Sequence, residues 1–419
     1  MTSELLARRR WLVLAASCLI NLCVGSLYAW SVFATPMAER LSALAGTEVG
    51  GLAIVFTIAN AVGPITMIAG GAINERLGPR KVVLAGGVLF AAGMVLSGFA
   101  TSKEMLMLTY GLGVGLGVGM VYGVTVSNSV KLFPDKKGLA GGLATASYGL
   151  SSVLVPPIAN ALMQAVGVAS AFKILGVAML VVIVLASTQI MACPAGFMAG
   201  GQAMGERSGA GELGCVPGSG LDADWRGMLA RSAFYAMIAM LLCGAFSGLM
   251  VTSQASPLAQ GLAGMSVGAA ALVVSVLALA NAGGRILAGA ASDRLGPVAS
   301  LRLAFVVLAV AMALLFGLGT QSVPFYLGIC LVGVCFGATM GIYPGFTAQQ
   351  FGAAHNSVNY GIMFVGFAAA GFFGPQAMSG LLAATGSYAP AFVVGGVLAA
   401  LGLVLTFVFD RLARGGEAA

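Results

Sequence analysis

Arg285 is the residue of this sequence whose type and setting most clearly predict chemistry. It stands in the stretch "ALANAGGRILAGAASDRLG" (278–296), among small apolar residues. A guanidinium is permanently charged, and its planar fork of N–H groups matches the two oxygens of a carboxylate. Asn281 lies four residues earlier, one helical turn away, where its amide can hydrogen-bond the guanidinium without neutralising it. The pair predicts a binding site for an anion.

The composition places this arginine in a membrane protein. Of the 419 residues, 59% are hydrophobic and only 8% are charged, whereas soluble domains carry roughly 25% charged residues. No charged residue separates Arg231 from Arg285, and the only His, Lys, Arg, Asp or Glu between Arg302 and Asp410 is His355. The net charge of +7 does not indicate nucleic-acid binding, because the basic residues fall in short segments between apolar stretches, where they set membrane topology.

Twelve apolar stretches are long enough to cross a bilayer as helices, which takes roughly 20 residues each. Their length and the lack of alternating ten-residue segments exclude a β-barrel. The sequence therefore predicts an all-α membrane protein with twelve transmembrane helices, at about 11–33, 50–73, 82–101, 104–130, 139–164, 168–192, 229–253, 265–290, 299–320, 323–350, 356–383 and 388–409.

The basic residues predict the orientation of these helices. With both termini in the cytoplasm, only Arg40, Lys103 and Lys173 face outward, Arg285 lies within a helix, and the other sixteen of the twenty Lys and Arg residues face inward. This asymmetry is the positive-inside pattern. The first apolar stretch runs on for about 23 residues without a convincing cleavage site, so we expect it to be kept as a span. A multi-pass protein of the cell membrane, in bacteria the inner membrane, is predicted.

An internal repeat divides the sequence into two halves. The segments "GAINERLGPRK" (71–81) and "GAASDRLGPVA" (289–299) share six identical residues at a constant offset of 218 positions. Two parallel six-helix halves are the architecture of the major facilitator superfamily, with the substrate site between halves near the midplane, and the sequence resembles that family. We expect halves at 1–192 and 229–419, joined by a flexible cytoplasmic linker at 193–228.

The repeated segment resembles the signature loop of that superfamily, in which an acidic residue and arginines hold neighbouring helix ends together. This resemblance implies a conformational role without substrate contact for five residues: Glu75, Arg76, Arg80, Asp293 and Arg294. Glycines also recur every four residues over 111–123 and over 333–345. That spacing puts them on one helical face and predicts close helix packing rather than a nucleotide-binding loop.

The depth of Arg285 predicts what it binds. Eight residues separate it from Asp293 at the inner end of its span, which places it about 12 Å deep. An arginine at the bilayer centre costs about 2.5–3.5 kcal/mol on insertion scales. All 13 acidic residues fall in predicted loops or termini, so we expect the substrate to supply the counter-charge. The alternative is a guanidinium held by backbone carbonyls and water.

Three tyrosines in the middle of predicted spans are further candidates, since a buried hydroxyl needs a hydrogen-bond partner. They are Tyr28, Tyr122 and Tyr148. Four segments around these residues and Arg285 resemble the oxalate/formate antiporter family and its monocarboxylate-transporter relatives: "GSLYAWSVFATPM" (25–37), "GVGMVYGVTVSNSVKLFPDKKGLAGGL" (117–143), "NAGGRILAGAASDRLG" (281–296) and "NSVNYGIMFVGFAAAGFFG" (356–374).

This resemblance implies that Arg285 and the three tyrosines bind substrate, together with the aromatic Phe364. A second basic residue of the oxalate exchangers, a lysine, falls on Phe367. Without it, a second carboxylate would remain uncompensated in a water-poor cavity. A small monocarboxylate such as lactate, pyruvate or formate balances one arginine and can rest its apolar end on Phe364 or Phe367. We therefore predict a secondary active transporter of small monocarboxylates that works by alternating access.

Energy coupling stays open at this point. The resemblance to monocarboxylate transporters favours proton symport, and anion exchange of the oxalate/formate type is the alternative.

His355 is interpreted as a solvent-exposed imidazole of an inner loop. Seven scattered cysteines without a CxxC pair indicate neither a disulfide framework nor a metal site. With no cofactor motif and no nucleophile–base set, we expect no enzyme and no cofactor. A non-transporting membrane sensor with a transporter fold is the second alternative, although we expect a sensor to carry a folded extension, for which the termini and the linker are short. A monomer is expected.

Overall fold

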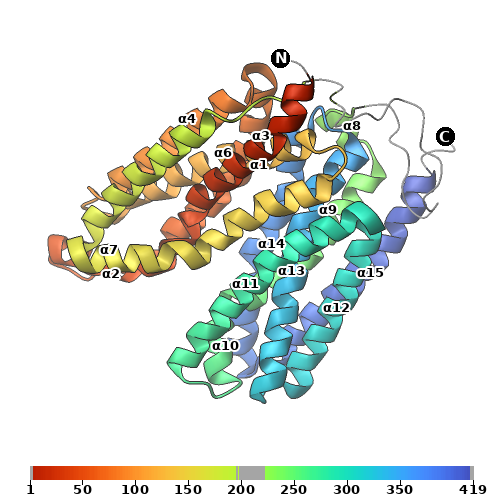
Figure 1. The fold of residues 1–419 in the computed structure, drawn as a ribbon. Helices are drawn as coiled ribbons and strands as arrows, with labels where there is room; N and C mark the ends of the chain where they lie inside the picture. The colour runs from red at the N-terminus through yellow and green to blue at the C-terminus, as the bar shows by residue number, and fades with distance from the viewer. Residues whose placement is uncertain (1–2, 195–196, 198–221, 416–419) are drawn as a thin grey trace. The chain divides into compact units, whose positions relative to one another are not determined.

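The computed structural model describes residues 3–194, 197 and 222–415, and all regular structure in them is helical (Figure 1). The elements in chain order are α1 (Ser3–Val24), η1 (Gly25–Ala29), α2 (Trp30–Ala45), α3 (Ala53–Leu77), α4 (Pro79–Ser97), α5 (Lys103–Leu106), η2 (Met107–Val114), α6 (Gly115–Leu132), α7 (Lys137–Ser187), α8 (Trp225–Leu229), α9 (Ser232–Ser253), α10 (Ala255–Gly261), α11 (Val267–Leu295), α12 (Pro297–Leu318), α13 (Ser322–Phe351), α14 (Asn356–Thr385) and α15 (Ala389–Gly415). Most of the predicted linker at 193–228 lies outside the described residues.

Eleven helical segments of the described part are long and apolar enough to cross a membrane. One of them, α7, has 51 residues and is broken at Gly167, where φ is 77°. Only glycine adopts such a positive φ at little cost, and the break separates the predicted spans 139–164 and 168–192. Eleven segments thus account for twelve crossings. The predicted all-α membrane fold is confirmed.

The helices run past the ends of the apolar stretches. The prediction that every acidic residue lies in a loop or terminus is therefore wrong for five residues: Glu39, Glu75, Glu104, Asp293 and Asp410 lie in α2, α3, α5, α11 and α15. A helix continues until a glycine or proline stops it, whereas the apolar stretch ends earlier, at the membrane boundary. Asp410 accepts a hydrogen bond from the half-buried Arg302 of α12.

The first span changes helical type where it carries a candidate residue. It runs through α1, η1 and α2, and η1 is a 3₁₀ turn that contains Tyr28. A methyl group on Gly25 would collide with the carbonyl oxygen of Tyr148 in α7. Glycine therefore lets the backbone of η1 approach α7 closely, which brings Tyr28 toward Tyr148.

The repeated loops have the same backbone conformation in both halves. Gly78 follows α3 with φ 80° and ψ 160°, and Gly296 follows α11 with φ 83° and ψ 154°. Each is followed by a proline, Pro79 or Pro297, that begins the next helix. Glycine supplies the positive φ that ends one helix, and proline suits the first position of the next. The sequence repeat is a structural repeat.

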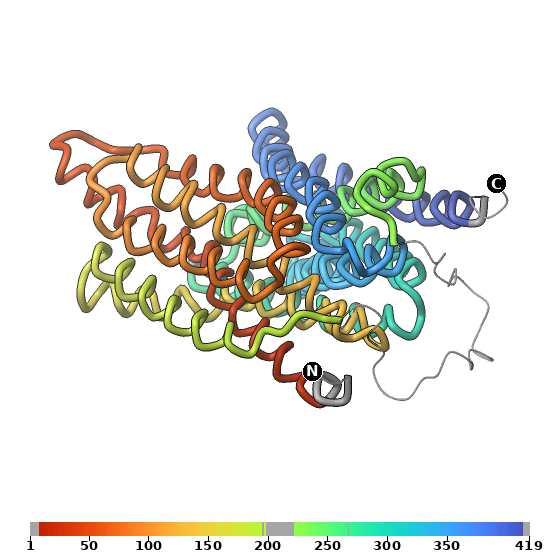
Figure 2. Tube along the Cα trace, turned by 90° about the horizontal axis from the view of Figure 1, so that it is seen from above, coloured from red at the N-terminus to blue at the C-terminus, as the bar shows by residue number. Residues whose placement is uncertain are grey.

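Contact analysis divides the chain into two compact units that differ from the sequence halves in two short segments. Unit 1 comprises residues 1–132, 147–200 and 355–362, and unit 2 comprises 133–146, 201–354 and 363–419. In unit 1, α1, α3 and α4 pack on α6 (Figure 2). In unit 2, α9, α11 and α12 pack on α13, and α15 packs on α9 and α12. The domain boundaries at 192 and 229 stay a prediction.

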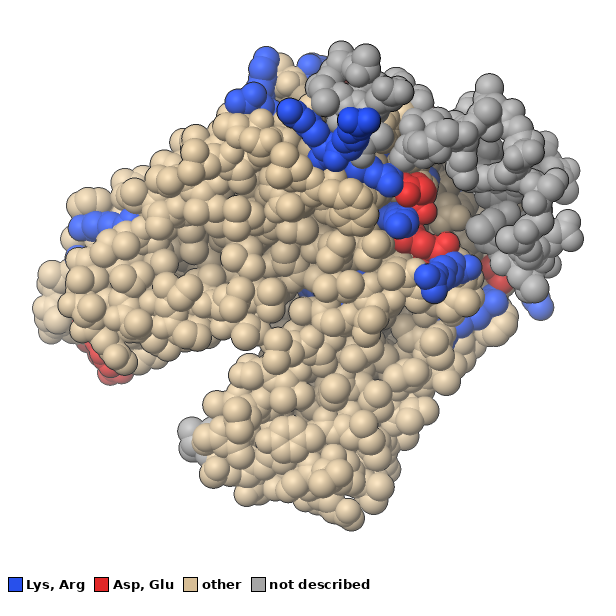
Figure 3. Space-filling model, in the orientation of Figure 1, with Lys and Arg blue, Asp and Glu red and all other residues tan. Residues whose placement is uncertain are grey.

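The lateral surface of the helices is apolar. Side chains such as Leu287, Ile65 and Val323 are 70%, 64% and 79% exposed, and the view in Figure 3 shows long sides of helices almost bare of charge. Large exposed apolar side chains on every span fit contact with lipid rather than water.

Candidate functional site

Arg285 lies in α11, ten residues before the end of the helix, and only 5% of it is exposed. The helix forms there because Ala, Leu and Ile continue a regular apolar run around the two glycines that precede the arginine. Two neighbouring helices approach its backbone through glycine. A methyl on Gly341 of α13 would lie 2.7 Å from the Arg285 Cα, and one on Gly142 of α7 would collide with the Arg285 carbonyl oxygen. Arg285 is thus fixed where α11 meets α13 and the first turns of α7, whose residues 137–146 belong to unit 2 like α11 and α13.

Two neutral groups hold the guanidinium. The Nε–H donates to the side-chain oxygen of Asn281 at 2.9 Å, and Nη1 donates to the backbone carbonyl of Thr145 at 2.8 Å. Thr145 is fully buried near the start of α7. Both bonds orient the side chain, and neither removes its charge.

No carboxylate pairs with Arg285 among the residues that the structure describes. Two of the ion pairs found there join Arg302 to Asp410 and His355 to Glu75, and neither includes Arg285. A buried cation without an anion is unfavourable by several kcal/mol, on the order of the cost of a central arginine in a bilayer. The guanidinium is therefore primed to bind an anion at the donor Nη2, for which the described residues provide no acceptor.

Asn281 also has one unused group. It is 8% exposed, and its Nδ2 is buried without a hydrogen-bond partner among the described residues. An unsatisfied buried donor costs about 1–3 kcal/mol. Arg285 and Asn281 thus both have N–H groups without an acceptor in the part of the chain that the structure describes.

The three candidate tyrosines form one cluster in unit 1. The ring centroids of Tyr28 and Tyr148 are 5.4 Å apart, and those of Tyr122 and Tyr148 are 4.7 Å apart. Tyr122 and Tyr148 are buried and Tyr28 is half-buried beside Phe56. Three helical segments, η1, α6 and α7, contribute one ring each. The structure brings together residues that are up to 120 positions apart in sequence, and their contact with a substrate stays a prediction.

The two candidate phenylalanines lie in α14 and belong to unit 2. Their ring centroids are 4.5 Å apart, and Phe367 also stacks parallel to Phe336 of α13 at 6.3 Å. Phe367 is 9% exposed, whereas Phe364 is half-buried. Sequence reasoning missed Phe336, for which the sequence gives no signal beyond its place in an apolar run. The three rings form an apolar cluster without a charge of its own.

The acidic residues of the repeated segments, Glu75 at the end of α3 and Asp293 at the end of α11, contact the starts of two distant helices. The carboxylate of Asp293 accepts the backbone N–H groups of Gly138 at 2.6 Å and Leu139 at 2.8 Å, in the first turn of α7. This is a helix N-cap provided by another helix, where a negative charge also meets the positive end of the helix dipole. The Oε1 of Glu75 lies 3.1 Å from the Nδ1 of His355, the residue before α14.

The arginines of these loops behave differently. Arg76, Arg80 and Arg294 are exposed and form no hydrogen bond or ion pair with any residue in the described ranges. His355, interpreted from the sequence as a solvent-exposed imidazole of an inner loop, lies in a loop with 38% of its side chain exposed, and its Nδ1 contacts Glu75. A conformational role for the loop residues stays a prediction.

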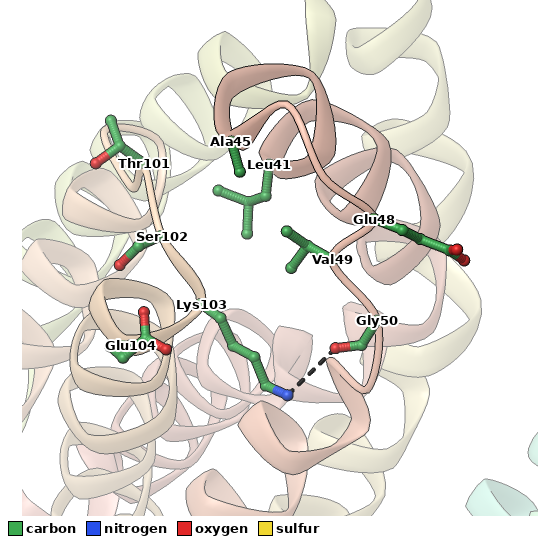
Figure 4. A pocket seen from close by; sticks show the side chains of 9 residues that line it. All are labelled: Leu41, Ala45, Glu48, Val49, Gly50, Thr101, Ser102, Lys103 and Glu104. Carbon is green, nitrogen blue, oxygen red and sulfur yellow. Dashed lines mark hydrogen bonds between the residues drawn. The ribbon is translucent and has the colours of Figure 1, made fainter.

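A pocket of about 360 Å³ lies elsewhere, in the loops that join α2 to α3 and α4 to α5 (Figure 4). Lys103 crosses it and donates to the Gly50 carbonyl at 3.2 Å. None of the candidate substrate residues lines it. Within the described residues there is also no group of three or more His, Cys, Asp or Glu side chains that could hold a metal ion.

Comparisons with known proteins bear on this arrangement. Residues 11–375 match the family model of the Major Facilitator Superfamily. The chain is 30% identical over 88% of its length to the uncharacterized MFS-type transporter YhjX of Escherichia coli, of which 87% is covered. It is 26% identical over 99% of its length to the oxalate:formate antiporter of Oxalobacter formigenes, of which 94% is covered.

A more distant relative is the mouse monocarboxylate transporter 11, which is 29% identical over 68% of this chain and 59% of its own length. Among solved structures, the outward conformation of the transporter FucP superposes with a TM-score of 0.71 over 94% of this chain and 98% of its own, at 12% identity. The predicted resemblance to oxalate/formate antiporters and monocarboxylate transporters is confirmed, and so is the predicted fold.

Proposed function

The chain belongs to the Major Facilitator Superfamily, and from this premise we propose that it carries small monocarboxylate anions across a membrane by alternating access. The observation that carries the proposal is Arg285, a buried cation of α11 that has no carboxylate partner among the described residues. In a carrier, the cargo supplies the missing charge. The names of the relatives support the class of cargo, since one is an oxalate:formate antiporter and another a monocarboxylate transporter.

Selectivity for one carboxylate follows from the apolar cluster of Phe336, Phe364 and Phe367. Charge balance at Arg285 is complete with one negative charge, and phenylalanine at 367 provides no second cation for a dicarboxylate. We propose that Phe364 and Phe367 contact the apolar end of the cargo. Tyr28, Tyr122 and Tyr148 are proposed as hydroxyl donors to it during the transport cycle.

Proton symport is the proposed mode of coupling, on the strength of the monocarboxylate-transporter relatives. A second mode, anion exchange, is favoured by one observation. No carboxylate of the described chain is available to neutralise Arg285 after the cargo leaves. The empty carrier must then change from its inward-open to its outward-open state with an unpaired buried cation, and this unfavourable charge slows the change. Exchange of one anion for another avoids that step.

We place the protein in the cell membrane, in bacteria the inner membrane, with both termini in the cytoplasm. This orientation is supported by the basic residues of the predicted inner loops, such as the exposed Arg76, Arg80 and Arg294. We propose that it acts as a monomer, without a cofactor and without enzymatic activity.

The test is uptake of labelled lactate by proteoliposomes that contain the purified full chain. Accumulation driven by an inward proton gradient supports symport, and accumulation that requires an internal monocarboxylate supports exchange. Binding without accumulation indicates a sensor and contradicts the proposal.

Selectivity is tested with Phe367→Lys in the same vesicles. We expect this variant to gain oxalate uptake, because a second cation compensates the second carboxylate. Phe373→Lys, an exposed position of the same helix, is the matched control and should not gain it. Oxalate rejection by Phe367→Lys would count against the charge-balance argument.

A further inference from the structure

The start of α14 contacts α3 through a pair of side chains whose charge depends on pH. The Nδ1 of His355, the residue before α14, lies 3.1 Å from the Oε1 of Glu75 in the last turn of α3. An ionised carboxylate only accepts hydrogen bonds, so Nδ1 carries the hydrogen and Nε2 is the nitrogen that binds a proton in acid. Histidine is the side chain that ordinarily changes charge between about pH 5 and pH 8. The contact is therefore a hydrogen bond from a neutral ring at high pH and an ion pair at low pH.

Buried hydrogen bonds beside this contact fix the same turn of α14. Asn74 of α3 donates from Nδ2 to the Ser357 hydroxyl at 3.0 Å, which donates to the hydroxyl of Ser127 in α6 at 3.0 Å. All three side chains are buried. A methyl on Gly71 would lie 2.7 Å from the Ser357 carbonyl carbon, so glycine lets the backbones of α3 and α14 touch. Through these contacts residues 355–362 belong to unit 1, although the rest of α14 belongs to unit 2.

The corresponding contact in the other half has different donors. The offset of 218 residues maps Glu75 onto Asp293 and His355 onto Lys137. Asp293 accepts two backbone N–H groups in the first turn of α7, and a backbone N–H does not change its charge with pH. The duplicated scaffold thus requires an acidic residue at the end of one helix and the start of another beside it. It does not require a histidine there.

The surroundings of His355 determine how its protonation acts on α14. The His355 carbonyl accepts the N–H of Asn359 at 3.0 Å, so the ring lies at the N-terminal end of α14, where the helix dipole disfavours a positive charge. The charged residues on the segments around the ring are Glu75 and Arg76 of α3, Lys131 of α6 one turn after Ser127, and Asp222, which accepts the N–H of Ala354. Glu75 contacts the ring, and its negative charge offsets the dipole when the ring is protonated.

We propose that His355 and Glu75 form a pH-sensitive latch: a proton from the cytoplasm that charges His355 holds the start of α14 more firmly on α3 and slows transport. The two side chains are 38% and 28% exposed, so solvent protons reach them. The effect on transport rests on the proposed function, because alternating access requires helix ends to part on one side at a time. In a carrier that brings protons in with its cargo, an acidified cytoplasm would slow further entry.

Hydrogen exchange of the purified full chain tests the latch without any cargo. The measured quantity is the protection of the backbone N–H groups of residues 359–362 in wild type relative to His355→Gln at the same pH, so that intrinsic exchange rates cancel. Glutamine keeps an N–H donor for Glu75 and cannot gain a charge. Acidification from about pH 7.5 to about pH 5.5 should raise this ratio about two- to fivefold, as for an exposed ion pair. An unchanged ratio would overturn the inference and leave the proposed function intact.

Three further variants identify the groups involved. Glu75→Gln removes the carboxylate, so the ratio of wild-type to variant protection should again rise in acid; this variant decides if His355→Gln does not fold. His355→Lys carries its charge at both pH values, so at about pH 7.5 it should be protected more than wild type. Glu39→Gln, an exposed glutamate of α2, is the matched control, and its ratio should stay constant. A constant ratio for Glu75→Gln as well would contradict the latch.

The effect on transport is measured as exchange of labelled lactate across proteoliposomes that have the same pH on both sides, so that no proton gradient drives it. The wild-type rate relative to that of His355→Gln should fall about two- to fivefold over the same acidification. A constant rate ratio would overturn the control of transport by the latch. If neither protein exchanges lactate at either pH, the proposed function fails, and hydrogen exchange still decides whether the latch exists.

Discussion

The contact of α6 with α3 and the contact of α13 with α11 have the same backbone arrangement and different side chains. In both, a row of glycines spaced by four lies against the neighbouring helix, as predicted from the spacing, and every one of the six compared glycines except Gly123 meets backbone atoms of that helix. The paired positions in the first half are Gly115 with Ala59, Gly119 with Gly63 and Gly123 with Met67, and those in the second half are Gly333 with Leu277, Gly337 with Asn281 and Gly341 with Arg285. Every pair in one half maps onto the other at the offset of 218 residues.

The comparison teaches that packing and binding are separable here. Small residues allow two helices to approach closely in either half, whatever the partner helix carries. Met67 is buried like Arg285, at 2% and 5% exposure, yet one fills space and the other presents a charge. The two halves share the glycine contact, and Arg285 with Asn281 in place of Met67 and Gly63 makes the second half the candidate binding site.

The largest effect on transport is expected when Arg285 is replaced by methionine, the residue at the corresponding position 67 of the first half. Arg285→Met should reduce lactate uptake by about 100-fold or more, because two charge-assisted hydrogen bonds to the carboxylate are lost. The melting temperature in detergent should not fall, since an apolar side chain replaces an uncompensated buried cation. Met67→Leu is the control and should transport normally.

Arg285→Lys sharpens the same comparison. It keeps the charge and removes the planar fork, so uptake should still be severely impaired. Near-normal uptake by either variant at this position would show that the second half does not use its arginine to bind cargo.

A smaller effect separates the two glycine rows. Gly341→Ala places a methyl group 2.7 Å from the Arg285 Cα, where the backbone must move, and should destabilise the protein by about 1–3 kcal/mol and reduce uptake. Gly123→Ala meets the flexible Met67 side chain at 3.3 Å, and the helix propensity of alanine offsets this contact by up to about 1 kcal/mol. Thermal unfolding of both variants is the measurement. Equal destabilisation of the two variants would contradict the expectation that the Met67 side chain moves aside for a methyl group more easily than the backbone at Arg285 does.

The smallest effect concerns the two acidic residues at the helix ends. Asp293→Ala removes the acceptor of two backbone N–H groups at the start of α7 and should cost about 1–2 kcal/mol. Glu75→Ala removes one half-exposed contact with His355 and should cost about 0.5 kcal/mol or less. Hydrogen exchange at Gly138 and Leu139 should accelerate in the first variant and stay unchanged in the second. Unchanged exchange in both would contradict the capping role of Asp293.

Much of this architecture could be predicted because it depends on periodicity. The spans follow from apolar length, the repeat from a constant offset, and the glycine contacts from four-residue spacing. The polar partners could not be predicted in the same way. Thr145 holds Arg285 through a backbone carbonyl, which every residue type has, and Asp293 caps a helix that begins 156 residues earlier in the chain. Such contacts depend on the tertiary fold and have no local signature.

The assignment of residues 133–146 to unit 2 has a consequence for hybrid proteins. The carbonyl that orients Arg285 and the N–H groups that Asp293 accepts come from the first half of the gene, although the residues that they serve are encoded in the second. In a chimera that joins the second half of this chain to the first half of a relative, the backbone carbonyl that orients Arg285 would therefore come from the relative. The chimera should work only where the relative also has a glycine at the position of Gly142, because any larger residue would push against the Arg285 carbonyl.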